Sequence, residues 1–103
     1  MEYRIWVPVD ENDTMANVRY FVERELVKRF GGFTCVFGVG GWANANGEVV
    51  NEAVAVYTAI KVGPPCEKDA IIVRRIARYV RVKCRQEAVL WSKGPCEAEM
   101  VTA

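Results

Sequence analysis

The chain has no histidine, almost no net charge and no long apolar run. Without histidine it cannot use Ser-His or Cys-His nucleophile pairs, histidine acid–base catalysis or most catalytic zinc sites. A net charge of +1 gives the whole molecule no strong electrostatic field. No apolar segment reaches the ~18 to 20 residues that cross a bilayer, and the amino-terminal residues lack a signal-peptide pattern. We therefore expect a cytoplasmic protein that does not bind membranes.

Cysteines are few and widely spaced: Cys35, Cys66, Cys84 and Cys96. No two of them have C-x-x-C spacing, so we expect reduced thiols and neither a metal nor a cofactor. A zinc site built from the four scattered cysteines is the alternative.

The residues that are present predict one small domain. The chain has 103 residues, of which 51% are hydrophobic, and this is enough for a core. Apolar periodicity predicts strands over 3–9, 33–42, 49–62 and 87–91 and helices over 15–30 and 67–84, the first capped by Asp13 or Thr14. Gly31-Gly32 ends the first helix, and Asn44 to Gly47 forms a turn. We place the domain at 1–92 and a C-terminal tail at 93–103.

The order βαββαβ is typical of an α+β, ferredoxin-like sandwich. This fold has an antiparallel four-stranded sheet with two helices on one face. The strand over 49–62 is apolar or small at both parities, so we expect it at the centre of the sheet. The other sheet face would then be open and apolar, which favours a homodimer or larger oligomer through that face. The alternative is that the tail folds over it.

A glycine-rich segment between the second and third strands is the most informative part of the chain. Gly38, Gly40 and Gly41 precede Trp42. Glycines at this density let the backbone approach a ligand closely, or let a strand bend. We place a ligand site on these residues together with Glu52 and Gln86; the candidate residues are Gly38, Gly40, Gly41, Trp42, Glu52 and Gln86. The alternative is a bulged strand with Trp42 packed on the sheet edge.

The second helix is strongly basic. Arg74, Arg78, Arg81 and Arg85 are spaced 4, 3 and 4 residues apart and form one stripe. Such a stripe is typical of a site for nucleic acid or another polyanion. The alternative is an ordinary solvated helix face.

The pattern GGFT, G-x-G-x-W, N-x-x-G-x-V-V-x-E and Gln86-Glu87-Ala88-Val89-Leu90 resembles a family of small proteins from bacteria, bacteriophages and mobile elements. The family pattern falls on Thr34, Gly38, Gly40, Trp42, Gly47, Glu52, Gln86 and Glu87. The resemblance implies a viral or plasmid-type accessory protein, possessing no activity that can be carried over. It also implies the host cytoplasm as its location.

Three functions are consistent with these observations. The first is a non-enzymatic, homo-oligomeric binding protein of a virus or mobile element, with a counter-defence role. It would sequester a small anionic, nucleotide-like ligand and would have no catalytic residue. Trp42 would stack on this ligand, the backbone of 38–41 and nearby arginines would hold its phosphate, and Glu52 and Gln86 would contact its polar edges. The second is a nucleic-acid-binding or host-protein-binding module that uses the basic helix. The third is a cofactor-independent enzyme with Glu52, Tyr57 or a cysteine as its acid–base group.

Overall fold

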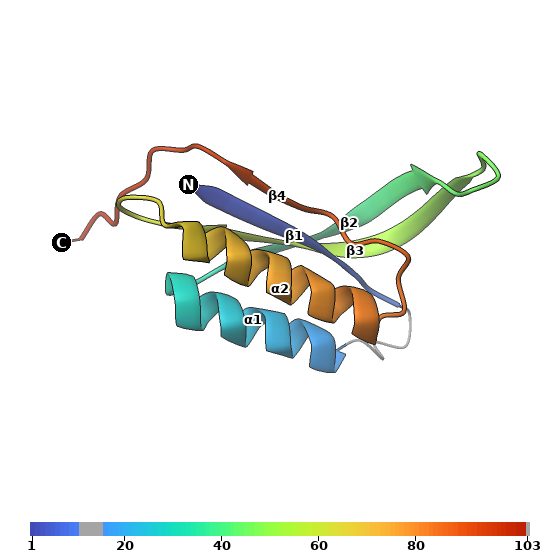
Figure 1. The fold of residues 1–103 in the computed structure, drawn as a ribbon, viewed down its shortest axis with the longest axis horizontal. Coiled ribbons are helices and arrows are strands. Elements are labelled where there is room, and N and C mark those ends of the chain that lie inside the picture. Colours follow the sequence, from blue (N-terminus) through green and yellow to red (C-terminus); the bar gives the residue numbers. More distant parts are fainter. Residues whose placement is uncertain (11–15, 103) are drawn as a thin grey trace.

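The computed structural model describes residues 1–10 and 16–102. The elements are β1 (Glu2–Pro8), α1 (Ala16–Phe30), β2 (Thr34–Ala43), β3 (Val49–Ile60), α2 (Glu67–Lys83) and β4 (Trp91–Gly94). All strand pairs are antiparallel, in the order β2-β3-β1-β4. Both helices cover one face of this sheet (Figure 1). The α+β, ferredoxin-like fold predicted from the sequence is confirmed, with β3 in a central position.

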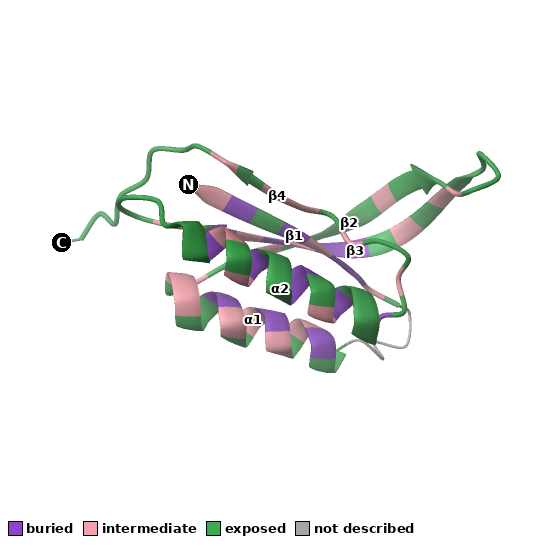
Figure 2. Cartoon of the chain, viewed as in Figure 1, coloured by how far each residue is buried: buried purple, intermediate pink, exposed green. Residues whose placement is uncertain are grey.

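Alternation along β1 explains how the core forms. Tyr3, Ile5 and Val7 are at most 2% exposed and face the helices, opposite Ala59, Tyr57 and Ala55 of β3. The helices contribute the apolar stripes of α1 and α2, which contain Val18, Val22, Leu26, Val73, Ile76 and Val80. The core therefore lies between the helices and the part of the sheet that contains β1 (Figure 2).

Helix and turn signals act where the sequence placed them. Gly31 adopts a φ of 84°, and its amide donates to the Val27 carbonyl, which ends α1. The side chain of Asn44 accepts hydrogen bonds from the amides of Asn46 and Glu48, which closes the turn between β2 and β3. The expected caps of α1, Asp13 and Thr14, lie outside the described residues.

The fourth strand was predicted too early. It occupies Trp91–Gly94 and pairs with Glu2–Ile5, whereas the sequence suggested 87–91. Residues 86–90 first have to carry the chain from the end of α2 to the edge of β1. Lys93 and Gly94, expected in the tail, therefore belong to the sheet, while residues 95–102 are exposed.

The end of α2 differs from the end of α1, because an arginine and not a glycine occupies the left-handed position there. α2 ends with Arg85 in the left-handed region, at a φ of 52°, and the Gln86 amide donates to the Arg81 carbonyl at 2.9 Å. This is the hydrogen-bond pattern of a Schellman motif, in which glycine is the usual residue at the Arg85 position. The turn directs residues 86–90 back toward the sheet. Neither helix in the described residues is long and apolar enough to cross a membrane.

Candidate functional site

A cavity of about 790 Å³ lies on the sheet face that the helices leave open. It forms where β1 ends: Pro8 pairs with Val54, and beyond this pair β2 and β3 continue without β1. The segment 86–90 borders the gap, and the Leu90 carbonyl accepts a hydrogen bond from the Trp6 amide at 3.1 Å. Three separate parts of the chain thus enclose one hollow.

Aromatic and apolar side chains form much of the cavity wall. Trp6 comes from β1 and Trp42 from β2, and Trp42 is 43% exposed. Gly40 lies between Trp42 and Val54; a Cβ there would stand 3.5 Å from a Val54 methyl and 3.9 Å from the Trp42 ring. The glycine therefore keeps the space beside the indole open. Exposed indole faces of this kind can stack on a flat heterocycle.

The acidic groups of the cavity are Glu52 on β3 and Glu87 in the segment 86–90. Burial raises the pKa of the Glu52 carboxyl. Gln86 also lines the cavity, and its amide nitrogen donates to the Cys84 carbonyl at 3.4 Å. No lysine or arginine is found among the described residues that line it. The cavity therefore suits a neutral or cationic ligand better than the anionic ligand expected from the sequence, because it offers carboxylates and no positive side chain.

Most of the residues proposed from the sequence meet at this cavity. Gly40, Gly41, Trp42, Glu52 and Gln86 all line it. Gly38 does not line it; Gly38 pairs with Val54, and a Cβ there would meet nothing within 4 Å. Whether the five bind a ligand stays a prediction.

Trp6, Pro8 and Asn44 also line the cavity and were not proposed as site residues. The position of Trp6 could have been predicted from the alternation of side chains along β1. Tyr3, Ile5 and Val7 face the core, so Trp6 faces the open side of the sheet. The contribution of Asn44 depends on how β2 and β3 twist, which parity alone does not predict.

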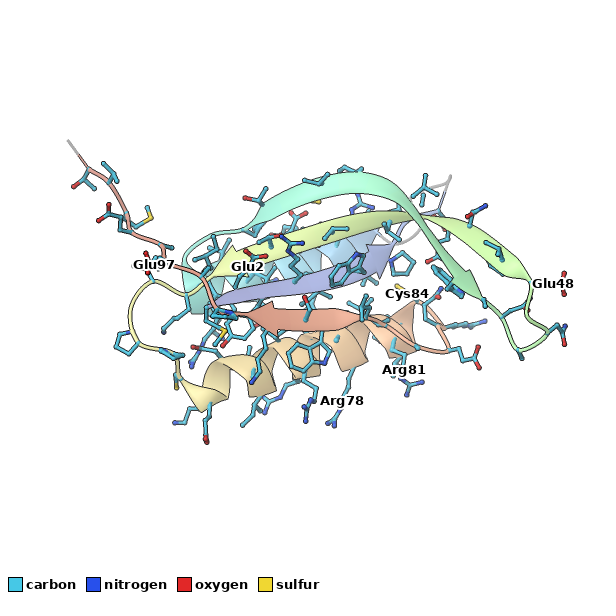
Figure 3. The ribbon with its side chains drawn as sticks, turned by 90° about the horizontal axis from the view of Figure 1, so that it is seen from above. Glu2, Glu48, Arg78, Arg81, Cys84 and Glu97 are labelled. Carbon is cyan, nitrogen blue, oxygen red and sulfur yellow. The ribbon has the colours of Figure 1, made fainter. Side chains whose placement is uncertain are left out.

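The four arginines of the basic stripe lie elsewhere. Arg74, Arg78 and Arg81 are exposed on α2, and Arg74 lies 5.5 Å over the ring of Trp91. Figure 3 shows Arg78 and Arg81 pointing away from the strands. Arg85 follows the helix in the Schellman turn. None of the four lines the cavity, so they cannot supply the phosphate contacts expected beside Trp42.

The other candidate acid–base groups face the core. Tyr57 is fully buried, and its hydroxyl donates to Glu23 at 2.6 Å. Burial, with the Glu23 hydrogen bond, raises its pKa far above the usual range. Burial also raises the pKa of the Cys84 thiol, with a smaller contribution from the charge of Glu52. Among the described residues, no cluster of acidic or cysteine side chains has a metal-binding arrangement.

Solved structures give a close match in fold. The chain is similar to a phage SAM lyase in complex with S-methyl-5'-thioadenosine, with a TM-score of 0.64 and 21% identity over 87% of this chain and 76% of that one. It is similar to the phage SAM lyase in its apo state at a TM-score of 0.62, again at 21% identity, over 87% and 75% of the two chains. No protein-family model and no curated protein matches the sequence.

This likeness overturns one expectation from the sequence. The chain was expected to be non-enzymatic, yet the two similar structures reported above are both of an enzyme. At 21% identity the comparison shows the shared fold, and the activity of this chain has to be argued from its own cavity.

Proposed function

We propose that the protein is an enzyme that cleaves S-adenosyl-L-methionine (SAM), or a closely related sulfonium nucleoside, in the cavity between Trp42 and the segment 86–90. The observation that carries the proposal is the composition of that cavity: two tryptophans, two carboxylates and no basic side chain among the described residues. SAM has a flat adenine and a positively charged sulfur, and these match stacking surfaces and carboxylates. The phage SAM lyase of the same fold supports this substrate.

The chemistry requires little from the protein. The carboxylate of the substrate's own aminocarboxypropyl chain can attack the chain carbon that is bonded to sulfur, closing a lactone ring as the bond from that carbon to sulfur breaks. The electron pair of the broken bond stays on sulfur, and the cation becomes the neutral thioether S-methyl-5'-thioadenosine. Since this leaving group is uncharged, it needs no acid to protonate it. A chain without histidine can therefore catalyse this reaction by binding and orienting the substrate.

Glu52 is the residue that we assign to the substrate. It is half-buried in the cavity, where the low dielectric strengthens its interaction with a cation. Trp42 stacks on the adenine, with Gly40 leaving the room that the ring needs. Glu52 thus acts by holding the sulfonium substrate in the reactive geometry.

The test is to incubate the purified protein with SAM and follow S-methyl-5'-thioadenosine by liquid chromatography and mass spectrometry. We expect the product to accumulate, and Glu52→Gln to lower kcat/KM by about 100-fold, in the range typical of positioned side chains. Glu48→Gln is the matched control, because Glu48 is exposed in the turn and does not line the cavity. Failure of the wild type to release the thioether would contradict the proposal; equal losses in both variants would remove Glu52 from it.

The proposal includes self-association through the open sheet face, as the sequence suggested. Val36 on that face is 61% exposed and lies opposite Val56, which pairs on its other side with Trp6. Exposed apolar residues in a cluster favour a protein contact. Light scattering of the purified chain tests this part, with a monomer at all concentrations as the contrary result. A role as an accessory protein of a virus or mobile element rests on the family resemblance and on the phage origin of the compared structures.

A further inference from the structure

The two helices form a positively charged layer on a nearly neutral chain. They carry ten of the fourteen basic residues and four of the thirteen acidic ones, which leaves four bases and nine acids elsewhere. Two of the four helical acids are already engaged inside. Asp69 is fully buried and accepts a hydrogen bond from Arg29 at 2.7 Å, and Glu23 accepts the Tyr57 hydroxyl. The outer surface of the layer is therefore even more basic than these counts indicate.

A groove runs between α1 and α2 on this outer surface, with a volume of about 560 Å³. We call it the helix groove. Its floor is apolar and comprises Phe21, Ile72, Ile76 and Tyr79, with the Phe21 and Tyr79 rings stacked at 3.9 Å. Its walls carry Lys28, Arg29 and Arg75, with Glu25 as the one acid. The groove thus combines an apolar base with a mostly basic rim.

Apolar residues also stand exposed among the bases of α2. Ile71, Arg75, Arg78 and Val82 are spaced 4, 3 and 4 residues apart and form the outermost row of the helix. Ile71 is 56% exposed and Val82 is 61% exposed. In the described part of the chain, neither Arg75 nor Arg78 forms an ion pair. This row leaves both apolar area and positive charge without a partner.

On α1 the same mixture faces solvent. Tyr20 is 62% exposed and Val27 is 47% exposed, and the guanidinium of Arg24 lies 5.6 Å from the centre of the Tyr20 ring. Lys28 follows Val27 and lines the groove. A partner that touches both helices would therefore meet apolar and basic side chains on each side.

We propose that the helix groove binds an acidic amphipathic helix of another protein. The apolar face of such a helix would fill the groove over Ile72 and Tyr79, and its carboxylates would meet Lys28, Arg75 and Arg78. Helix-in-groove recognition buries apolar anchors spaced three or four residues apart, and the charged rim sets orientation and specificity. Nucleic acid fits less well, since phosphates would leave Ile71 and Val82 against a polar, hydrated backbone.

This surface is separate from the proposed catalytic cavity. The two hollows share no lining residue, and they lie on opposite layers of the fold. Binding at the helix groove can therefore succeed or fail independently of SAM cleavage.

The experiment selects binders from a displayed library of random 16-residue peptides, using the full chain as target. We expect enrichment of sequences with apolar residues at i, i+3, i+4 and i+7 and with several Asp or Glu. The best peptide and a shuffled version of it, both fluorescently labelled, are then titrated with the protein by anisotropy. Arg75→Glu and Ile71→Ser should each weaken binding at least tenfold. Lys93→Glu is the matched control; it changes the net charge by the same amount as Arg75→Glu, at an exposed position of β4, and should leave binding unchanged.

Several outcomes would overturn the proposal. One is enrichment of peptides without acidic residues; another is equal binding of the shuffled peptide or of the Arg75→Glu protein. A labelled 20-base-pair DNA that competes with the peptide and is insensitive to Ile71→Ser would assign the surface to nucleic acid. A change in oligomeric state caused by Arg75→Glu alone would assign it to a second copy of this chain. Circular-dichroism spectra and melting temperatures equal to those of the wild type confirm that the variants are folded, whether or not the protein cleaves SAM.

Discussion

The two ends of β3 have similar residues and opposite surroundings. Val54, Ala55, Tyr57 and Ala59 are 7% exposed or less, whereas Val49 in the same strand is 74% exposed. The inner part has β1 on one side and the helices beneath it, while the outer part pairs with β2 alone. Figure 1 shows β2 and β3 extending past the ends of both helices. Burial of an apolar strand therefore depends on where its neighbours end, which strand propensity does not record.

The cavity lies at the boundary between these two parts. Pro8 is the last residue of β1 that pairs with β3, and its partner is Val54. Glu52 lies two residues from Val54, in the part of β3 that extends past β1. A strand that ends while its neighbour continues leaves a concave gap, and the segment 86–90 borders it. The inner part of the sheet, which packs against the helices (the packed half), thus positions the cavity walls. The part of β2 and β3 beyond β1 (the outer half) contributes Trp42, Gly40 and Gly41 to the cavity.

The largest effect is expected for the ion pair between Asp69 and Arg29, which links the elements of the packed half. Asp69 is fully buried, binds Arg29 and has Lys61 at 3.9 Å, so it joins α2 to α1 and to the end of β3. Asp69→Ala leaves two cations without their anion and should lower the free energy of unfolding by about 3 kcal/mol. Urea denaturation measures this, with Glu67→Ala in the same helical turn as an exposed control. A loss as small as that of the control would show that the buried pair does not stabilise this half.

A matched pair of valines tests the contrast between the halves directly. Val7 is fully buried in β1, and Val39 in β2 is 78% exposed. Val7→Ala should cost about 2 kcal/mol, because it removes buried methyl groups and leaves a cavity. Val39→Ala should change stability by less than about 0.5 kcal/mol. If Val39→Ala cost as much as Val7→Ala in dilute solution, a partner would have to cover the outer half.

A gain in stability is expected where the chain leaves α2 for the cavity. Arg85 has a φ of 52°, a conformation that is costly for any residue except glycine. Arg85→Gly should therefore raise the free energy of unfolding by about 1 kcal/mol, after the greater freedom of glycine in the unfolded chain is offset. Arg78→Gly, in the body of α2, should lower it by about 1 kcal/mol. Both substitutions remove an arginine side chain. If both changed the free energy of unfolding in the same direction, the backbone at Arg85 would not be strained.

The smallest effect concerns pH and the outer half. Burial raises the pKa of Glu52, so its folded-state pKa lies above the unfolded one. Ionisation of the Glu52 carboxyl therefore destabilises the folded state. The free energy of unfolding falls as the pH rises from the unfolded-state pKa toward the folded-state pKa. Glu52→Gln should melt at a higher temperature than the wild type at pH 7 and at the same temperature below pH 4. A difference that persists at low pH would have another cause, such as an altered shape of the cavity.

Much of the fold follows from local rules. Alternation in β1 identifies Tyr3, Ile5 and Val7 as core, and Gly31 marks the end of α1. The fourth strand was misplaced because Val89 and Leu90 resemble a strand in sequence. They lie instead along the cavity, and pairing beyond Trp91 depends on the free edge of β1. No local pattern contains that long-range information.

The site was harder to predict than the fold. Gly40, Trp42 and Glu52, which the sequence grouped, line one cavity, since Gly40 and Glu52 are cross-strand partners, whereas Gly38 does not line it. The charge of the cavity was not predictable: the sequence shows many arginines but not which way they face. In the folded chain Arg78 and Arg81 point away from the strands, so Glu52 and Glu87 determine the charge of the cavity.

Separation of charge between the helix layer and the rest of the chain also affects how molecules meet in solution. The isoelectric point is about 7.6, so near neutral pH there is almost no net repulsion between molecules. Each molecule still has one basic and one more acidic side, and opposite sides attract at low ionic strength. Salt at 0.1 M limits such attraction to about 10 Å. The protein should accordingly be more soluble in moderate salt than in dilute buffer. A protein whose molecules repel one another through a net charge of one sign should behave in the opposite way.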